Sequence, residues 1–178
     1  MKKDKNIVIA GVGGQGSILA AKILGSLFLA RGYDVKLNEV HGMSQRGGVV
    51  VTMCKAGEKV FSPLVTPGTA DILIGMELSE AVRAAPYLKP EAKTFVSSRV
   101  IPIAGQGAFA DPGIYKTIDA LAIAEKAGNK RCENTVLLGA ASKALDFTRE
   151  EWEAAICEHV KPEHIDVNLK AFTEGQAV

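Results

Sequence analysis

The segment Gly11–Gly16, with the sequence GVGGQG, has the composition of a phosphate-binding loop. Gly11, Gly13 and Gly16 satisfy the G-x-G-x-x-G pattern, after a short apolar segment and before a predicted helix. Glycines permit a tight turn and let backbone N–H groups approach a phosphate, and a helix N-terminus adds partial positive charge. We therefore predict that a phosphate-bearing ligand is bound by Gly11, Gly13, Gly14, Gln15, Gly16 and Ser17.

Two other interpretations of this loop stay open. The glycines could serve only to let the first strand and helix pack closely. A dinucleotide could also bind, because Glu39 follows at the end of the second predicted strand, where dinucleotide folds place an acid for a ribose hydroxyl. A free-standing NAD(P)- or FAD-dependent oxidoreductase is thus one hypothesis, although the chain is short for an additional substrate domain. A P-loop is excluded, since Ser17 and not Lys follows Gly16.

A second unusual segment, HGMSQRGG, follows the second predicted strand. It offers several hydrogen-bond donors, and its glycines allow close approach, which suits an anion or the backbone of a partner. We expect Arg46 to contribute to anion binding and the remaining residues to form a partner interface: His41, Gly42, Met43, Ser44, Gln45, Gly47 and Gly48. One His without a nearby thiol or carboxylate pair does not predict a metal site.

The composition is that of an ordinary globular domain. The chain has 178 residues, 47% of them hydrophobic and 23% charged, with a net charge of +1. No basic block predicts nucleic-acid binding. The longest apolar segment, 18–30, is too short to span a bilayer, and no well-formed signal peptide is present. We expect one domain over residues 1–178, located in the cytoplasm and neither nucleic-acid- nor membrane-bound.

The three cysteines, Cys54, Cys132 and Cys157, are far apart in the sequence. They form no C-x-x-C pair, so neither a disulfide framework nor a structural zinc site is expected. Iron–sulfur clusters usually take four thiolates, which this chain cannot supply alone. We interpret the cysteines as free thiols.

Strand and helix patterns alternate along most of the chain. Strands are predicted at 6–10, 34–40, 48–54, 58–61, 71–76, 93–97 and 100–103. Helices are predicted at 16–31, 77–86, 119–128 and 134–146, with a glycine-rich loop at 104–117. This order favours an α/β fold: a Rossmann-like, mainly parallel sheet with helices on both faces. Segments 48–54 and 58–61 predict a β-hairpin inserted in that pattern.

The C-terminal part predicts a helical tail. Thr148 and Glu151 form the capping-box pattern, and Phe147 can pack on Trp152. Pro162 can open a last helix, with Ile165, Leu169 and Phe172 facing inward.

The two loops together resemble those of a known family, the small γ-type subunits of 2-oxoacid:ferredoxin oxidoreductases. The segments IVIAGVGGQG at 7–16 and EVHGMSQRGGVV at 39–50 carry the resemblance, which is strongest to the members that act on indolepyruvate. The segments ADILIGME at 70–77 and NTVLLGAASK at 134–143 are also similar, so the resemblance covers nearly the whole chain.

The resemblance implies a subunit that completes an enzyme and is not catalytic alone. The family converts a 2-oxoacid, coenzyme A and oxidised ferredoxin into acyl-CoA, carbon dioxide and reduced ferredoxin. The resemblance implies that a large partner subunit holds thiamine diphosphate, Mg and the iron–sulfur clusters. It also implies that ferredoxin interacts with the complex through that partner. The HGMSQRGG segment favours indolepyruvate or another arylpyruvate as the oxoacid, while branched-chain oxoacids, pyruvate and 2-oxoglutarate stay open.

The glycine loop then needs a role in a chain without a redox motif. Our hypothesis is that both loops face the large subunit, and that the Gly11–Ser17 loop and Arg46 help to position coenzyme A through its phosphates. A docking role without ligand is the weaker version. A pure interaction module is a third alternative, for which a stable, ligand-free homodimer of the isolated chain would be the signature.

Overall fold

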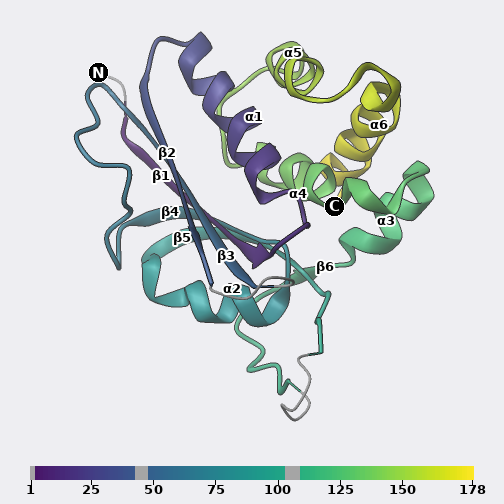
Figure 1. Cartoon of the computed structure of the whole chain (residues 1–178), viewed down its shortest axis with the longest axis horizontal. Helices are drawn as coiled ribbons and strands as arrows, with labels where there is room; N and C mark the ends of the chain where they lie inside the picture. Colours follow the sequence, from purple (N-terminus) through teal and green to yellow (C-terminus); the bar gives the residue numbers. More distant parts are fainter. Residues whose placement is uncertain (1–2, 43–47, 103–108) are drawn as a thin grey trace.

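The computed structural model describes residues 3–42, 48–102 and 109–178, and its centre is a six-stranded sheet (Figure 1). The strand order is β2-β3-β1-β4-β5-β6. The strands are β1 Lys5–Val12, β2 Asp34–His41, β3 Val49–Gly57, β4 Ala70–Gly75, β5 Leu88–Ser97 and β6 Thr117–Ile118. β1, β4, β5 and β6 run parallel, so their carboxyl ends meet at one edge of the sheet, hereafter the carboxyl edge. The α/β prediction is confirmed as a mixed sheet.

The antiparallel part is a hairpin of β2 and β3, which differs from the hairpin predicted within 48–61. β3 pairs antiparallel with β2 on one side and with β1 on the other. Both edges of β3 are therefore occupied, and segment 58–61 has no strand to join. Instead the Val60 N–H donates to Asp34 Oδ2 (2.7 Å), which fixes this segment as a turn.

The strand predicted at 100–103 is wrong for residues 100–102, which are irregular. Here the backbone is bound outside the sheet: Leu78 N–H donates to Arg99 O (2.8 Å), and Ile101 N–H donates to Glu77 Oε1 (3.0 Å). Residue 103 lies outside the described residues, as does 104–108 of the predicted loop. Residues 109–116 are irregular as expected, and β6 follows.

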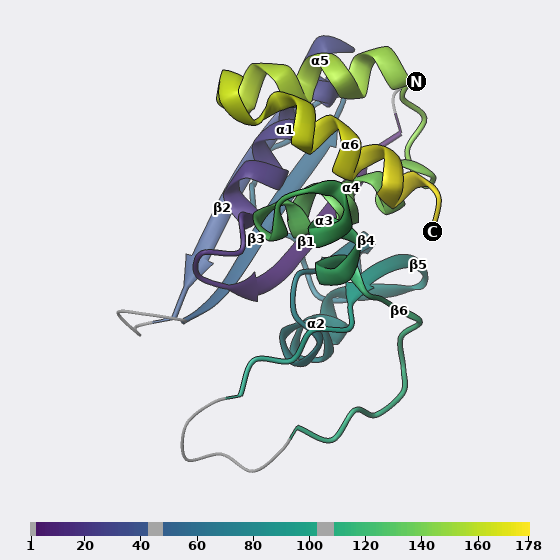
Figure 2. The same cartoon turned by 90° about the vertical axis from the view of Figure 1, so that its right-hand side faces the viewer.

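Helices cover both faces of the sheet, as predicted (Figure 2). The larger layer contains α1 Ser17–Ala30, α3 Ala120–Ala127, α4 Glu133–Ser142, α5 Arg149–His159 and α6 Ile165–Gln176. The opposite face carries α2 Leu78–Ala84 over a smaller core. Short 3₁₀ turns, η1 Ala85–Tyr87, η2 Lys130–Cys132 and η3 Pro162–His164, join these elements. None of the helices in the described ranges is long and apolar enough to cross a membrane.

The helical tail predicted from local sequence signals is confirmed. Thr148 and Glu151 form the predicted capping box at the start of α5. Phe147 and Trp152 pack edge to face with ring centroids 6.2 Å apart, and Trp152 also contacts Phe172 on α6. Trp152 and Phe172 are fully buried, so the tail closes the larger core and holds α4 against the sheet.

Candidate functional site

The glycine loop connects β1 to α1 at the carboxyl edge. Gln15 organises it: its Oε1 accepts from Val12 N–H (2.8 Å), and its Nε2 donates to Met76 O (3.2 Å) at the end of β4. Gly16 has the left-handed conformation (φ 80°) that precedes the first turn of α1. The N–H groups of Gly14 and Gly16 have no acceptor among the described residues. The loop is thus held rigidly while part of its backbone stays available to a ligand.

The second loop meets the first at this edge. Gly13 N–H donates to Gly48 O (3.0 Å), and Gly42 N–H donates to Val49 O (2.8 Å) to close the β2–β3 hairpin. Gly42 and Gly48 therefore lie at the same edge of the sheet as the glycine loop. His41, half-exposed at the end of β2, forms an ion pair with Glu39. Five predicted site residues lie outside the described ranges: Met43, Ser44, Gln45, Arg46 and Gly47.

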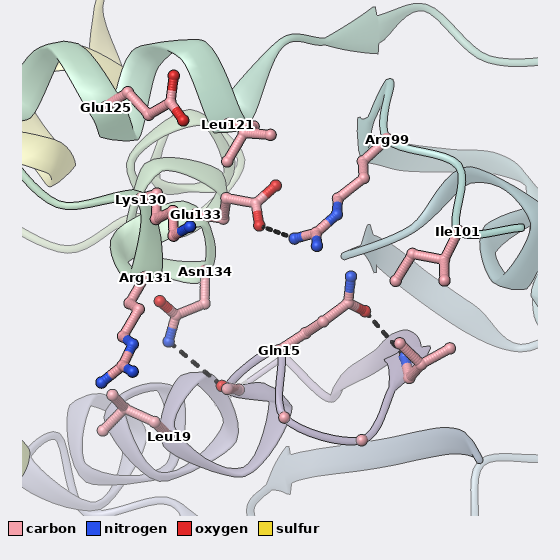
Figure 3. Close-up of a pocket in the computed structure, with 14 residues that line it drawn as sticks. Gln15, Leu19, Arg99, Ile101, Leu121, Glu125, Lys130, Arg131, Glu133 and Asn134 are labelled. Atoms are coloured by element: carbon pink, nitrogen blue, oxygen red, sulfur yellow. Dashed lines mark hydrogen bonds and ion pairs between the residues drawn. The ribbon is translucent and has the colours of Figure 1, made fainter. Parts of the chain in front are cut away.

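A cavity of about 490 Å³ lies over the glycine loop (Figure 3). Gly13, Gly14, Gln15 and Gly16 form its floor. Its walls come from α1, from the segment after β5, from α3 and from the start of α4. The wall residues are Leu19, Arg99, Ile101, Leu121, Glu125, Lys130, Arg131, Glu133 and Asn134. Ligands of open α/β sheets bind at such carboxyl edges.

Three cations and two acids line the cavity. Arg99 Nη1 forms an ion pair with Glu133 Oε2, across the mouth of the site in Figure 3. Burial raises the pKa of the Glu133 carboxyl, while Arg99 opposes that shift. Lys130 and Arg131 are exposed at the rim, where they add positive potential next to the loop.

Side chains from other elements fix the walls relative to the loop. Asn134 Nδ2 donates to Gly16 O (3.3 Å), which ties α4 to the start of α1. Glu77, fully buried after β4, accepts from Ser79 Oγ (2.6 Å), Glu80 N–H (2.8 Å) and Ile101 N–H (3.0 Å). Its carboxylate thereby caps α2 and holds the segment that carries Arg99. The cavity is preorganised by its own scaffold.

The predicted site residues divide into two groups. Gly13, Gly14, Gln15 and Gly16 line the cavity. Gly11 and Ser17 do not: Gly11 packs beneath Gln15 and against Met76, and Ser17 is buried in the first turn of α1. Gly11 therefore allows close packing, but against Gln15 and the end of β4 and not against α1.

The sequence analysis missed the walls of the cavity. Arg99, Lys130, Arg131, Glu133 and Asn134 belong to no motif, and they come from segments distant from the glycine loop. One signal was available for Arg99, because it follows a predicted parallel strand and must lie near the carboxyl edge. Nothing in the local sequence shows that α4 begins against Gly16.

The dinucleotide interpretation does not fit this sheet. β3 lies between β1 and β2, so Glu39 is two strands from the glycine loop, roughly 10 Å by ordinary strand spacing. Its carboxylate is engaged by His41 and by Thr52 Oγ1 (3.2 Å). Glu39 also does not line the cavity. In a dinucleotide fold, the acid that binds the ribose lies on the strand next to the glycine loop. Here Glu39 lies one strand further away.

The cysteines do not fit an iron–sulfur cluster. Cys54 lies in β3, Cys132 in η2 and Cys157 in α5, and burial raises the pKa of the Cys54 thiol to about 12. Within residues 3–42, 48–102 and 109–178 no three metal-ligating side chains of His, Cys, Asp or Glu gather. The described residues therefore offer no ligand set for an iron–sulfur cluster.

The fold and the cavity define an α/β domain with a cavity at the carboxyl edge of its sheet. Residues 6–178 match the family model described as pyruvate ferredoxin/flavodoxin oxidoreductase, and the chain belongs to this family.

The sequence is similar to subunits of indolepyruvate and ketoisovalerate oxidoreductases. The chain is 39% identical to indolepyruvate oxidoreductase subunit IorB of Thermococcus kodakarensis, covering 97% of this chain and 95% of that protein. It is 38% identical, with the same coverage, to the subunit of that name from Pyrococcus horikoshii. It is 31% identical to ketoisovalerate oxidoreductase subunit VorA of Methanothermobacter thermautotrophicus, over 97% of this chain but 36% of that protein.

Solved structures share the fold. The γ subunit of a keto/oxoacid ferredoxin oxidoreductase from Geobacter sulfurreducens aligns with a TM-score of 0.72 and 24% identity, over 96% of this chain and 95% of that one. A 2-oxoglutarate:ferredoxin oxidoreductase from Magnetococcus marinus, solved with 2-oxoglutarate, coenzyme A and succinyl-CoA, aligns with a TM-score of 0.78 and 21% identity. The alignment covers 99% of this chain and 31% of that one. The family model and the full-length relatives, together with this shared fold, identify the chain as a small subunit of the 2-oxoacid:ferredoxin oxidoreductase type, and the free-standing dinucleotide enzyme is not supported.

Proposed function

We propose that this chain completes a cytoplasmic oxidoreductase that oxidatively decarboxylates indolepyruvate or another arylpyruvate. The substrate class is supported by the full-length similarity to indolepyruvate oxidoreductase subunits. Thiamine diphosphate, Mg and the iron–sulfur clusters belong to a large partner subunit, which passes electrons to ferredoxin. That division of labour agrees with the scattered cysteines of this chain.

The contribution of this chain is to position coenzyme A next to the partner's active site. The observation that carries this proposal is the 490 Å³ cavity, in which the glycine loop and three cationic side chains converge. Available N–H groups of the loop suit a phosphate, and Lys130 and Arg131 attract an anionic ligand to the rim. The phosphate end of coenzyme A would be held here, while its thiol reaches the partner.

The second loop belongs to the partner interface in this proposal. Gly13 and Gly48 are hydrogen-bonded, so the surface around Gly48 borders the cavity. A large subunit seated on that surface would cover the cavity from one side and bring its own active site to the thiol. His41 and Gly42 mark the described part of this interface.

The test is steady-state kinetics of the complex reconstituted from this chain and its large partner. Indolepyruvate oxidation would be followed with a viologen acceptor while the coenzyme A concentration is varied. Gly13→Val adds bulk to the cavity floor, and the nearest atom to a Cβ there is Gly48 O at 4.0 Å, so the Cβ itself meets no clash. We expect the KM for coenzyme A to rise about tenfold, a loss of ~1.4 kcal/mol of binding, with little change in the KM for indolepyruvate.

The matched control is Gly25→Ala, which lies in the interior of α1 away from the cavity. It should leave both KM values unchanged. If Gly13→Val impaired assembly but the assembled complex kept a normal KM for coenzyme A, the positioning role would be wrong and the docking role would replace it. If the complex oxidised pyruvate or 2-oxoglutarate but no arylpyruvate, the substrate assignment would be wrong.

A further inference from the structure

Arg99 is built into the cavity wall more firmly than a surface arginine. Its carbonyl accepts from Leu78 N–H (2.8 Å), its own N–H donates to Ser97 Oγ (3.2 Å), and Glu77 binds the chain two residues later. The side chain is 37% exposed, and within the described residues its guanidinium is engaged through Nη1 alone. A guanidinium carries five N–H donors, so most of its capacity to bind an anion is unused.

The partner of Arg99 is an unusually placed carboxylate. The Glu133 side chain is only 10% exposed, and Oε1 has no hydrogen-bond donor among the described residues. Burial raises the pKa of this carboxyl, and the acidic neighbours Asp119 and Glu125 act in the same direction. The charged groups around it are Arg99 after β5, Asp119 and Glu125 at α3, and Lys130 and Arg131 in η2. A buried carboxylate oxygen without a hydrogen-bond donor carries a desolvation cost, so pairing Arg99 with Glu133 costs free energy.

We propose that Arg99 is the phosphate-binding cation of this cavity, and that Glu133 holds its guanidinium in place until a phosphate ester displaces the carboxylate. The proposal rests on the proposed function, because the phosphate ester in question is that of coenzyme A.

The exchange follows from the two geometries. A phosphate can engage the guanidinium through two parallel N–H···O bonds, whereas Glu133 uses one. Once Arg99 turns to the phosphate, the group that kept Glu133 charged is gone, and the buried carboxyl takes up a proton from solvent. Binding of the anion is therefore coupled to uptake of one proton, and the cavity keeps a cation in a defined position before the ligand arrives.

The experiment uses the isolated full chain and inorganic pyrophosphate, titrated by calorimetry in two buffers of different ionisation enthalpy. Arg99→Ala should weaken pyrophosphate binding by about tenfold or more, and Arg99→Lys, which keeps the charge but not the fork, by an intermediate factor. Glu133→Gln removes the competing charge, so binding should tighten by about threefold and the proton uptake assigned to Glu133 should disappear. The wild-type minus Glu133→Gln difference removes the titration of pyrophosphate itself.

The matched control is Arg83→Ala. It removes the same charge from α2, where Arg83 faces Glu80 (3.6 Å) outside the cavity, and should not change binding. The proposal would be overturned if wild type bound no pyrophosphate, if Arg99→Ala and Arg99→Lys behaved like Arg83→Ala, or if Glu133→Gln weakened binding with unchanged proton uptake. If these variants behave as expected while Gly13→Val leaves the KM for coenzyme A unchanged, the exchange stands and the coenzyme assignment fails.

Discussion

Glycines do opposite work in the helical layer and at the carboxyl edge. A Cβ on Gly139 in α4 would lie 2.2 Å from Phe172 O, and one on Gly175 in α6 would lie 2.1 Å from Val136 O. At the edge, a Cβ on Gly13 would meet nothing nearer than 4.0 Å, and one on Gly14 would meet nothing within 4 Å. The helical layer uses glycine to remove space between two helices. At the edge, Gly13 and Gly14 leave space beside the backbone, which is what a ligand needs, whereas Gly11 and Gly16 of the same loop are closely packed.

The largest expected effect is therefore in the helical layer. Gly139→Ala places a methyl group against the backbone of α6, and neither helix can move without disturbing Trp152 and Phe172. We expect the free energy of unfolding to fall by ~3 kcal/mol or more, because overpacked cores relax poorly. Urea denaturation of the isolated chain measures this loss.

Gly25→Ala is the control for helix propensity. It is also a glycine inside a helix, but a Cβ there would only touch Leu37 Cδ1 at 3.5 Å, which is ordinary contact. This substitution should be neutral or stabilise the chain by ~0.5–1 kcal/mol. Equal losses for Gly139→Ala and Gly25→Ala would show that close helix packing is not what Gly139 provides.

The two regions also differ in what could be predicted from the sequence, because one depends on local signals and the other on contacts between distant segments. The helical tail was predictable because its signals are local: Thr148 and Glu151 are three residues apart, and Phe147 lies close in sequence to Trp152, on which it packs. The glycine loop was predictable for the same reason. The cavity walls were not, because Arg99 and Glu133 are 34 residues apart and meet only when β5 and α4 pack.

Competition between distant segments also misdirected one prediction. Segment 58–61 looks like a strand that could pair with β3, and nothing local contradicts it. β1 occupies one edge of β3 and contributes apolar residues to both cores, while β2 occupies the other edge and packs Val35 on the larger core, so the hairpin forms with β2. β1, β2 and segment 58–61 compete for the edges of β3. Which of them pairs with β3 cannot be predicted from the sequence of segment 58–61 alone.

Acid should affect the two regions in opposite directions. In the helical layer, Arg31 donates two hydrogen bonds to Glu151 (2.7 and 2.6 Å), which lower the pKa of that carboxyl to about 2. Because this folded-state pKa lies below the ordinary value, the pair stabilises the fold above about pH 4.5 and loses its effect as the pH falls toward 2. At the edge, the raised pKa of Glu133 means that protonation relieves a penalty.

Urea midpoints measured for wild type and Arg31→Ala across that acid range test this difference. Arg31→Ala should be less stable than wild type near neutral pH, and the gap should narrow on acidification. Arg149→Ala, which breaks an exposed pair with Glu153 on α5, is the control and should show a smaller gap. A gap that stayed constant with pH would mean that Arg31 acts through its packing on Phe147 and not through Glu151.

The smallest expected effect is at the edge, where Gly13→Ala should change the free energy of unfolding by no more than ~0.5 kcal/mol. Gly13 does not have a positive φ, and its surroundings are open. Gly14→Ala is the matched neighbour: it has equal space but a φ of 94°, so it should cost ~1 kcal/mol through backbone strain alone. A large loss for Gly13→Ala would mean that its hydrogen bond to Gly48 needs the bare backbone, and the edge would then share the packing role that glycine has in the helical layer.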